Sequence, residues 1–140
     1  MWLLYAFLSA IFAAAVAIFG KLGLKTIDST LATTIRSIIM AIFLFLVAIT
    51  LKKFDGFNFN SLNGKDWVLI SLSGIAGALS WLFYFFALKY GMAGKVVAVD
   101  RLSIVFVILF AALFLGEGLT WRSVGGAILI AGGALLITLK

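Results

Sequence analysis

The sequence predicts an all-α integral membrane protein with five transmembrane helices, and two observations lead to this fold class. The first is composition, because 65% of the 140 residues are hydrophobic, only 11% are charged, and the mean hydropathy is +1.27. A soluble domain is closer to half apolar and a quarter charged, and a small one has too little interior to bury so much apolar surface. The second is that the apolar residues form five runs long enough to cross a bilayer.

The five runs divide the chain at clusters of charged residues and glycine. Each contains about 20 mostly apolar residues, which is the length that a spanning helix needs. The first run could also be read as a signal peptide, but it lacks a positively charged start, so we interpret it as a spanning helix. We expect a single membrane domain over residues 1–140, with helices near 2–21, 30–51, 66–88, 94–115 and 120–139.

Polar residues and glycine stand where several of these helices should begin or end. Asp28, Asp66 and Thr120 occupy the expected N-cap positions of the second, third and fifth helices, because their side chains accept hydrogen bonds from free helix amides. Gly116 suits the end of the fourth helix. The chain contains no proline, so no helix is expected to be kinked by that residue.

The longest connection, Lys52 to Lys65, alternates aromatic and polar residues. Its Phe54, Phe57 and Phe59 are separated by aspartate and asparagine. Aromatic rings favour the boundary between lipid and water, so we expect this loop to lie at the level of the lipid headgroups.

The basic residues are balanced between the two sides of the membrane. An odd number of spans places the chain ends on opposite sides, and the positive-inside rule sets orientation from the difference in lysine and arginine counts. Either both orientations occur, or weak local cues select one. One side holds Lys52, Lys53, Lys65 and Arg122, and the other holds Lys21, Lys25, Lys89, Lys95 and Lys140.

Ionisable residues interrupt two of the predicted spans. Arg36 lies inside the second, and the adjacent pair Asp100 and Arg101 lies inside the fourth. A charge near the membrane centre costs about 2.5 to 3.5 kcal/mol even on the most lenient scale, so such residues face the helix bundle or a watery cavity. Both helices begin on the side where the first helix ends in Lys21. The four charges are therefore expected in one leaflet.

Two interpretations of these charges stay open. Asp100 could pair with Arg36 or Lys21 only to hold helices together, and Arg101 could extend to the interface. Alternatively, three cations and one carboxylate bind a small molecule that carries a carboxylate or phosphate. Ser103 shares a helix face with Asp100, and Ser80, Trp81 and Tyr84 recur along one face of the third helix, although such faces also serve ordinary helix packing. The candidate substrate-binding residues are Lys21, Arg36, Ser80, Trp81, Tyr84, Asp100, Arg101 and Ser103.

Four glycines mark the fifth helix as a packing surface. Gly125 with Gly132, and Gly126 with Gly133, are spaced by seven residues and form a smooth stripe. Small residues let another helix approach closely in a membrane, either inside the subunit or across a dimer.

Composition also excludes several classes of function. The chain has no cysteine and no histidine, so the usual metal ligand sets and nucleophiles are missing, and no metal, cofactor or enzymatic activity is expected. The net charge of +6 comes from lysines and arginines scattered at helix ends, which does not favour nucleic-acid binding.

Several segments resemble the EamA-type branch of the drug/metabolite transporter superfamily, particularly its small five-helix bacterial and archaeal members. The similarity lies in Ala87-Leu88-Lys89-Tyr90, Leu115-Gly116-Glu117 and the run Gly125 to Gly132, together with Lys21 and Arg36. The resemblance implies one half of a ten-helix inverted-repeat transporter in the cell (plasma or inner) membrane, completed by an antiparallel second copy. Many relatives have a proline in the fourth helix near the position of Asp100 to Ser103. This chain has no proline there, so the helix break that a proline makes in those relatives cannot be transferred to it.

We therefore expect a dual-topology homodimer that acts as a secondary transporter by alternating access. Its partners would be membrane lipid and a small-molecule substrate, and Asp100 would either exchange a proton or remain a charged ion-pair partner. Two alternatives are a flippase for lipid-linked substrates, or its accessory subunit, and a structural membrane subunit. A cationic-drug exporter is not expected, because Met1 to Lys21 contains no acidic residue.

Overall fold

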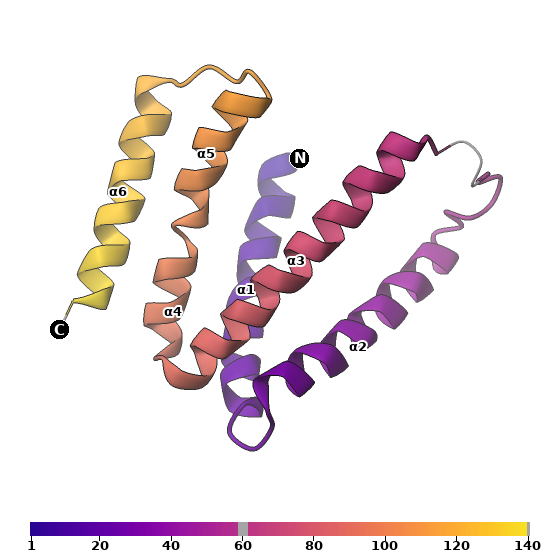
Figure 1. Ribbon diagram of the computed structural model, residues 1–140, viewed down its shortest axis with the longest axis horizontal. Helices are drawn as coiled ribbons and strands as arrows, with labels where there is room; N and C mark the ends of the chain where they lie inside the picture. Colours follow the sequence, from indigo (N-terminus) through magenta and orange to yellow (C-terminus); the bar gives the residue numbers. More distant parts are fainter. Residues whose placement is uncertain (59–61, 140) are drawn as a thin grey trace. The chain divides into compact units, whose positions relative to one another are not determined.

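The computed structural model describes residues 1–58 and 62–139, and within them it contains six α-helices and no strand. Five stretches are long and apolar enough to cross a membrane, because α4 and α5 together form one of them, Ala93–Phe114. The prediction of a multi-pass, all-helical membrane protein is confirmed. The helices in Figure 1 are α1 (Trp2–Gly23), α2 (Ser29–Thr50), α3 (Gly64–Tyr90), α4 (Ala93–Asp100), α5 (Ser103–Phe114) and α6 (Trp121–Thr138).

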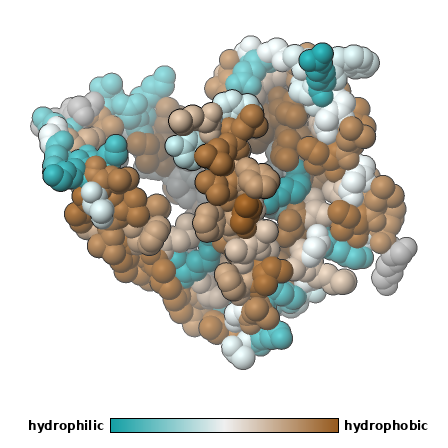
Figure 2. All heavy atoms as spheres, turned by 180° about the vertical axis from the view of Figure 1, so that it is seen from behind, coloured by the Kyte–Doolittle hydropathy of each residue, from teal (hydrophilic) through white to brown (hydrophobic). Residues whose placement is uncertain are grey.

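Large apolar side chains face outward along every helix, as a lipid-facing protein requires. Apolar residues cover most of the surface visible in Figure 2. Leu113 is 75% exposed and Leu129 is 77% exposed, although both lie in the middle or last turns of spanning helices. Only a few residues are buried, among them Ala17, Leu88 and Ala134. Lipid replaces the interior of a soluble protein as the apolar environment of these helices.

The chain divides into two compact units, residues 1–21 with 90–140 and residues 22–89. In the first unit, α6 packs along both α4 and α5 (Figure 1). Ala98, Ala127 and Ala134 are buried there, and small side chains of this kind allow close helix packing. The Lys95 ammonium donates a hydrogen bond of 3.0 Å to the Thr138 carbonyl at the C-terminal end of α6.

The second unit is the pair α2 and α3. Ser29 and Thr33 of α2 are buried, as are Phe85 and Leu88 of α3, so the core of the pair lies where α2 begins and α3 ends. At the same end, an ion pair of 3.8 Å between Lys89 Nζ and Asp28 Oδ2 joins α3 to the N-cap of α2.

The predicted fourth helix is interrupted, which corrects the expectation of one continuous element near residues 94–115. α4 ends at Asp100 and α5 begins at Ser103, without a proline. The Leu102 amide donates to the Val99 carbonyl at 3.0 Å, and the Val105 amide donates to the Leu102 carbonyl at 2.9 Å. These i to i+3 bonds replace the α-helical i to i+4 ladder, as in a short 3₁₀ segment.

Most predicted helix ends are confirmed, and one is wrong. Asp28 and Thr120 are N-caps, and Thr120 forms a reciprocal capping box with Ser123. Gly116 has φ +67° just after α5, the left-handed conformation that terminates many helices. Asp66 is not an N-cap, because α3 already begins at Gly64 and the Asp66 carboxylate accepts the Asn63 amide from inside the first turn.

The loop after α2 begins with a conformation that the sequence did not indicate. Lys52 has φ 51°, and the Lys53 amide donates to the Ala48 carbonyl at 2.9 Å, so the left-handed position that usually holds glycine holds lysine. Phe54 is 44% exposed and contacts Phe45, with 5.7 Å between ring centroids. Phe59 and Lys140 lie outside the described residues. The placement of this loop at the headgroups remains a prediction.

The N-cap of α2 predicts a pH-dependent stability. The Asp28 carboxylate accepts the Leu31 and Thr30 amides at 3.2 and 2.9 Å, and these hydrogen bonds lower the pKa of Asp28 below its ordinary value of 3.8. Because the folded pKa is depressed, the stabilisation is present above pH 3.8 and is lost as the pH falls through the folded pKa.

The measurement is thermal unfolding of wild type and Asp28→Asn at a series of pH values. The asparagine side chain can still accept these bonds but does not ionise, so the variant should lose less stability than wild type below pH 4. Asp55→Asn, in the following loop, is the matched control and should keep the wild-type pH profile. Equal profiles for wild type and Asp28→Asn would contradict the prediction.

Candidate functional site

Arg36 stacks on an aromatic side chain of the neighbouring helix. It lies two turns into α2, and its Cζ atom is 3.7 Å from the centroid of the Trp81 ring and 5.4 Å from that of Phe85, both on α3. A cation over an aromatic face is attracted by the ring quadrupole, and removal of water strengthens this attraction. The sequence prediction that Arg36 and Trp81 belong to one site is consistent with this contact.

Three rings of α3 form an aromatic cluster beside the guanidinium. The ring centroids of Trp81 and Tyr84 are 5.5 Å apart in an edge-on arrangement, and Phe85 lies 6.1 Å from each of them. Residues three and four apart on a helix share a face, so the spacing 81, 84, 85 brings these side chains together. The cluster provides a rigid, apolar support for Arg36.

Arg36 has no acidic partner in its own unit. The carboxylates of residues 22–58 and 62–89 belong to Asp28, Asp55 and Asp66, and none of them forms an ion pair with Arg36. Asp28 pairs with Lys89 instead. The guanidinium is only half-buried and interacts electrostatically with the Tyr84 side chain, and none of its five N–H donors forms a hydrogen bond within the described residues. Such a group can bind an anion.

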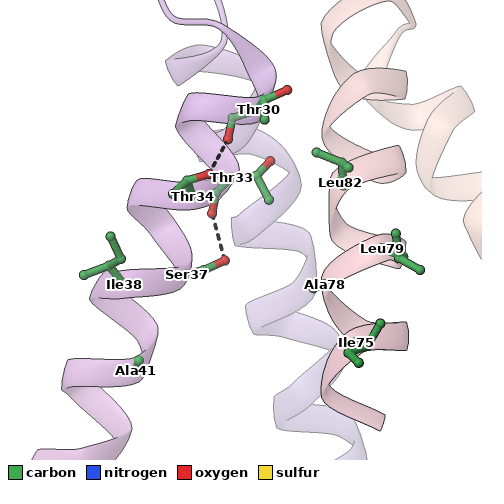
Figure 3. A pocket seen from close by; sticks show the side chains of 10 residues that line it. All are labelled: Thr30, Thr33, Thr34, Ser37, Ile38, Ala41, Ile75, Ala78, Leu79 and Leu82. Atoms are coloured by element: carbon green, nitrogen blue, oxygen red, sulfur yellow. Dashed lines mark hydrogen bonds between the residues drawn. The ribbon is translucent and has the colours of Figure 1, made fainter. Parts of the chain in front are cut away.

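A groove of about 600 Å³ lies between α2 and α3 (Figure 3). Its α2 wall carries hydroxyl groups, and its α3 wall is apolar. The hydroxyls of Thr33, Thr34 and Ser37 each donate to the carbonyl four residues earlier, at 2.7, 2.9 and 2.8 Å. Their protons are therefore used inside the helix, and these oxygens present lone pairs to the groove. The lining residues are Thr30, Thr33, Thr34, Ser37, Ile38, Ala41, Ile75, Ala78, Leu79 and Leu82.

The other predicted site residues are distributed over both units. Ser80 is exposed on α3, and its hydroxyl group hydrogen-bonds to none of the described residues. In the first unit, the Lys21 ammonium donates a hydrogen bond of 2.7 Å to the Gly91 carbonyl between α3 and α4. This bond gives Lys21 a structural role that the sequence did not reveal, because it joins residues 70 positions apart.

Asp100, Arg101 and Ser103 flank the interruption between α4 and α5. All three are exposed, and within the described part of the first unit none of them forms an ion pair or a side-chain hydrogen bond. Asp100 is therefore not paired with Lys21, which belongs to the same unit. Its predicted pairing with Arg36 would join two different units and remains a prediction.

The four glycines of α6 lie on an open face. A Cβ atom added to Gly125, Gly126, Gly132 or Gly133 would have no described atom within 4 Å, apart from its chain neighbours and the nearby backbone of α6. At 100° per residue Gly125 and Gly132 lie about 140° to 160° from the buried Ala127, and Gly126 and Gly133 lie about 100° to 120° from it, so the stripe lies on the back and side of α6 relative to its buried face. The described chain thus offers no helix in close contact with this stripe.

Two features of the site were not predicted. Phe85 completes the aromatic cluster, and its spacing of four from Trp81 was the available signal. The hydroxyl wall of the groove is visible in the sequence as Thr30, Thr33, Thr34 and Ser37, which occupy successive turns of one apolar helix. No group of three or more metal-ligating acidic residues occurs in the described ranges.

Comparison with known proteins agrees with this architecture. The sequence model described as the EamA-like transporter family matches residues 1–139. A protein of Sinorhizobium sp, named "Uncharacterized transporter in cobO 3'region", is 43% identical over 136 residues, which cover 97% of this chain and 95% of the relative. No solved structure matches the chain significantly.

Proposed function

Because this chain belongs to the EamA-like transporter family, we propose that it is a secondary transporter for a small organic anion that works as an antiparallel homodimer by alternating access. The observation that carries this proposal is the stacked Arg36, a cation inside a spanning helix with no carboxylate partner in its unit. A charge in such a position is functional by default, since its cost must be offset by a partner or a ligand.

The need for a second copy follows from the size of the chain. Inverted-repeat transporters place the substrate between two halves of opposite orientation, and alternating access moves one half against the other. The described residues contain five spans, and a relative has nearly the same length as this chain. Two copies in opposite orientations supply both halves. The near balance of lysine and arginine supports insertion in both directions.

Flux into proteoliposomes tests the transport function. The assay uses a panel of radiolabelled organic anions, first with wild type and then with Arg36→Gln and Arg122→Gln. Arg36→Gln removes the charge in the span and should lower flux by about tenfold or more, whereas the exposed Arg122 in the first turn of α6 is dispensable. Equal loss of flux in both variants, or no flux in wild type with any anion, would contradict the proposal.

Labelling tests the dual orientation directly. The chain has no native cysteine, so Asp55→Cys places one thiol in the loop after α2 without a background signal. A membrane-impermeant maleimide applied to intact cells should label about half of the molecules. After permeabilisation the same reagent should also label the remaining half. Complete labelling from one side only would refute insertion in both directions. Gly118→Cys, in the loop before α6, is the matched control and should give the same proportions.

A lipid-linked substrate is the second candidate. Arg101 lies beside the α4 to α5 interruption, and a long arginine side chain that extends to the interface is able to hold a phosphate there. Stabilisation of the purified protein by a lipid-linked phosphate, and by no water-soluble anion, would favour that function.

A further inference from the structure

We infer that the Arg36 site selects a monovalent carboxylate with an apolar body, and that it discriminates against phosphate esters. This inference rests on the proposed function, because it names the substrate class of the same site. It follows from how the guanidinium is held, from the number of charges available, and from the chemistry of the adjacent groove.

The stacking contact determines which part of the guanidinium is free. The separation of 3.7 Å between Cζ and the Trp81 centroid is too short for an N–H group to stand between them, so the guanidinium presents its face to the indole. The N–H donors of a guanidinium lie in its plane. They are consequently directed along the edge, where two parallel N–H groups match the two oxygens of a planar carboxylate.

The spanning parts of α2 and α3 carry one positive charge, which suits a ligand with one negative charge. Arg36 is the one charged residue of α2, and the lysines and the aspartate of α3 lie in its first and last turns, where Lys89 pairs with Asp28. A carboxylate brings one negative charge, whereas a phosphate monoester brings between about 1.5 and 2 at neutral pH. The excess charge would stay unbalanced in the span. On the lenient insertion scale a full uncompensated charge weakens binding by about a hundredfold.

The surroundings of Arg36 indicate the rest of the ligand. Trp81, Tyr84 and Phe85 offer apolar ring surface, and the groove beginning one turn away at Thr33 has Leu79 and Leu82 on its opposite wall (Figure 3). The donor protons of the hydroxyls Thr33, Thr34 and Ser37 are already bonded to helix carbonyls. The groove thus provides no free hydroxyl proton from these residues for a second anionic group, and it suits a hydrocarbon body.

The test uses three ligands that share the 3-methylbutyl group as their hydrocarbon body: 4-methylpentanoate, 3-methylbutyl phosphate and the neutral 4-methylpentanamide. Binding is measured by isothermal titration with the purified full chain in detergent. Wild type should bind the carboxylate at least about tenfold more tightly than the phosphate and the amide. Similar or tighter binding of the phosphate, or no binding of the carboxylate, would overturn the inference.

Variants separate the stacked geometry from the bare charge. Arg36→Lys keeps the single positive charge but loses the two parallel N–H donors, so carboxylate binding should weaken by about tenfold while the preference over phosphate that comes from charge remains. Trp81→Leu removes the stacking surface and should weaken carboxylate binding by about tenfold, and Arg122→Lys is the matched control that leaves binding unchanged. Unchanged carboxylate affinity in Arg36→Lys would overturn the role of the paired donors. If a variant fails to fold, the wild-type ligand series still decides the outcome.

The carboxylate preference and the transport function are refuted by different results. Selective carboxylate binding without flux of any anion would refute the transport proposal and leave this inference standing. Flux of phosphate esters at the rate of carboxylates would refute the inference and leave the transport proposal standing.

Discussion

Asp100→Asn is expected to abolish accumulation of substrate against its gradient while leaving binding intact. Asp100 ends α4 at the interruption of a spanning segment, and it is the one described carboxylate that lies inside a span away from the membrane ends. A carboxylate in such a place must bind a proton, a cation or a positively charged side chain, because the bare ion is costly in lipid. Asparagine has nearly the same shape but cannot exchange a proton.

The measurement compares gradient-driven uptake with binding. Uptake by Asp100→Asn should fall by about tenfold or more when a proton or sodium gradient is imposed, while the affinity measured without a gradient changes by less than about threefold. Glu117→Gln, in the connection between α5 and α6, is the matched control and should transport as wild type does. Unchanged uptake combined with a lower melting temperature would instead make Asp100 a structural ion-pair partner.

Gly133→Leu is expected to dissociate the proposed dimer without unfolding the subunit. Apart from its chain neighbours and the nearby backbone of α6, no described atom lies within 4 Å of the Cβ position, so the isolated chain leaves space where a side chain at this position begins. A second copy packed against the stripe of Gly125, Gly126, Gly132 and Gly133 would meet the added side chain, because close helix packing in membranes depends on small residues.

The measurement is the oligomeric state in detergent and in lipid, by light scattering and by crosslinking. Gly133→Leu should convert most of the dimer into monomer, and the helical content by circular dichroism should stay that of wild type. Leu135→Phe adds bulk to an exposed position of the same helix outside the stripe, and it should leave the dimer intact. A dimer that survives Gly133→Leu would exclude the glycine stripe as the interface.

The number and positions of the spanning segments could be predicted from the sequence because hydropathy and helix caps are local properties. Asp28 and Thr120 cap the helices that their positions indicated. The interruption at residues 101–102 could not be predicted, since no proline or glycine marks it and it appears only in the hydrogen bonds of Leu102 and Val105. Local patterns also misplaced the start of α3, because Asp66 bonds backward to Asn63 from inside the helix.

The sequence indicated which residues belong to the candidate site, but it did not indicate how they contact one another. The cost of charge in lipid identified Arg36, and helical spacing identified Trp81 and Tyr84. The stacking of Arg36 on Trp81 depends on how two helices separated by a long loop pack, which is a tertiary property. The Lys21 contact with the Gly91 carbonyl is likewise set by packing, and a positive charge at the end of a helix did not indicate it.

The cation stack on Trp81 also gives the protein an internal optical reporter. The other three tryptophans, Trp2, Trp67 and Trp121, lie in the first turns of their helices and are 74%, 47% and 89% exposed. Trp81 alone lies mid-helix with a guanidinium against its ring. With the three terminal tryptophans replaced by phenylalanine, the emission of the remaining indole depends on the charge and hydration of Arg36. Binding of a ligand at Arg36 can then be followed, without a label, as a change in the emission wavelength and intensity of Trp81.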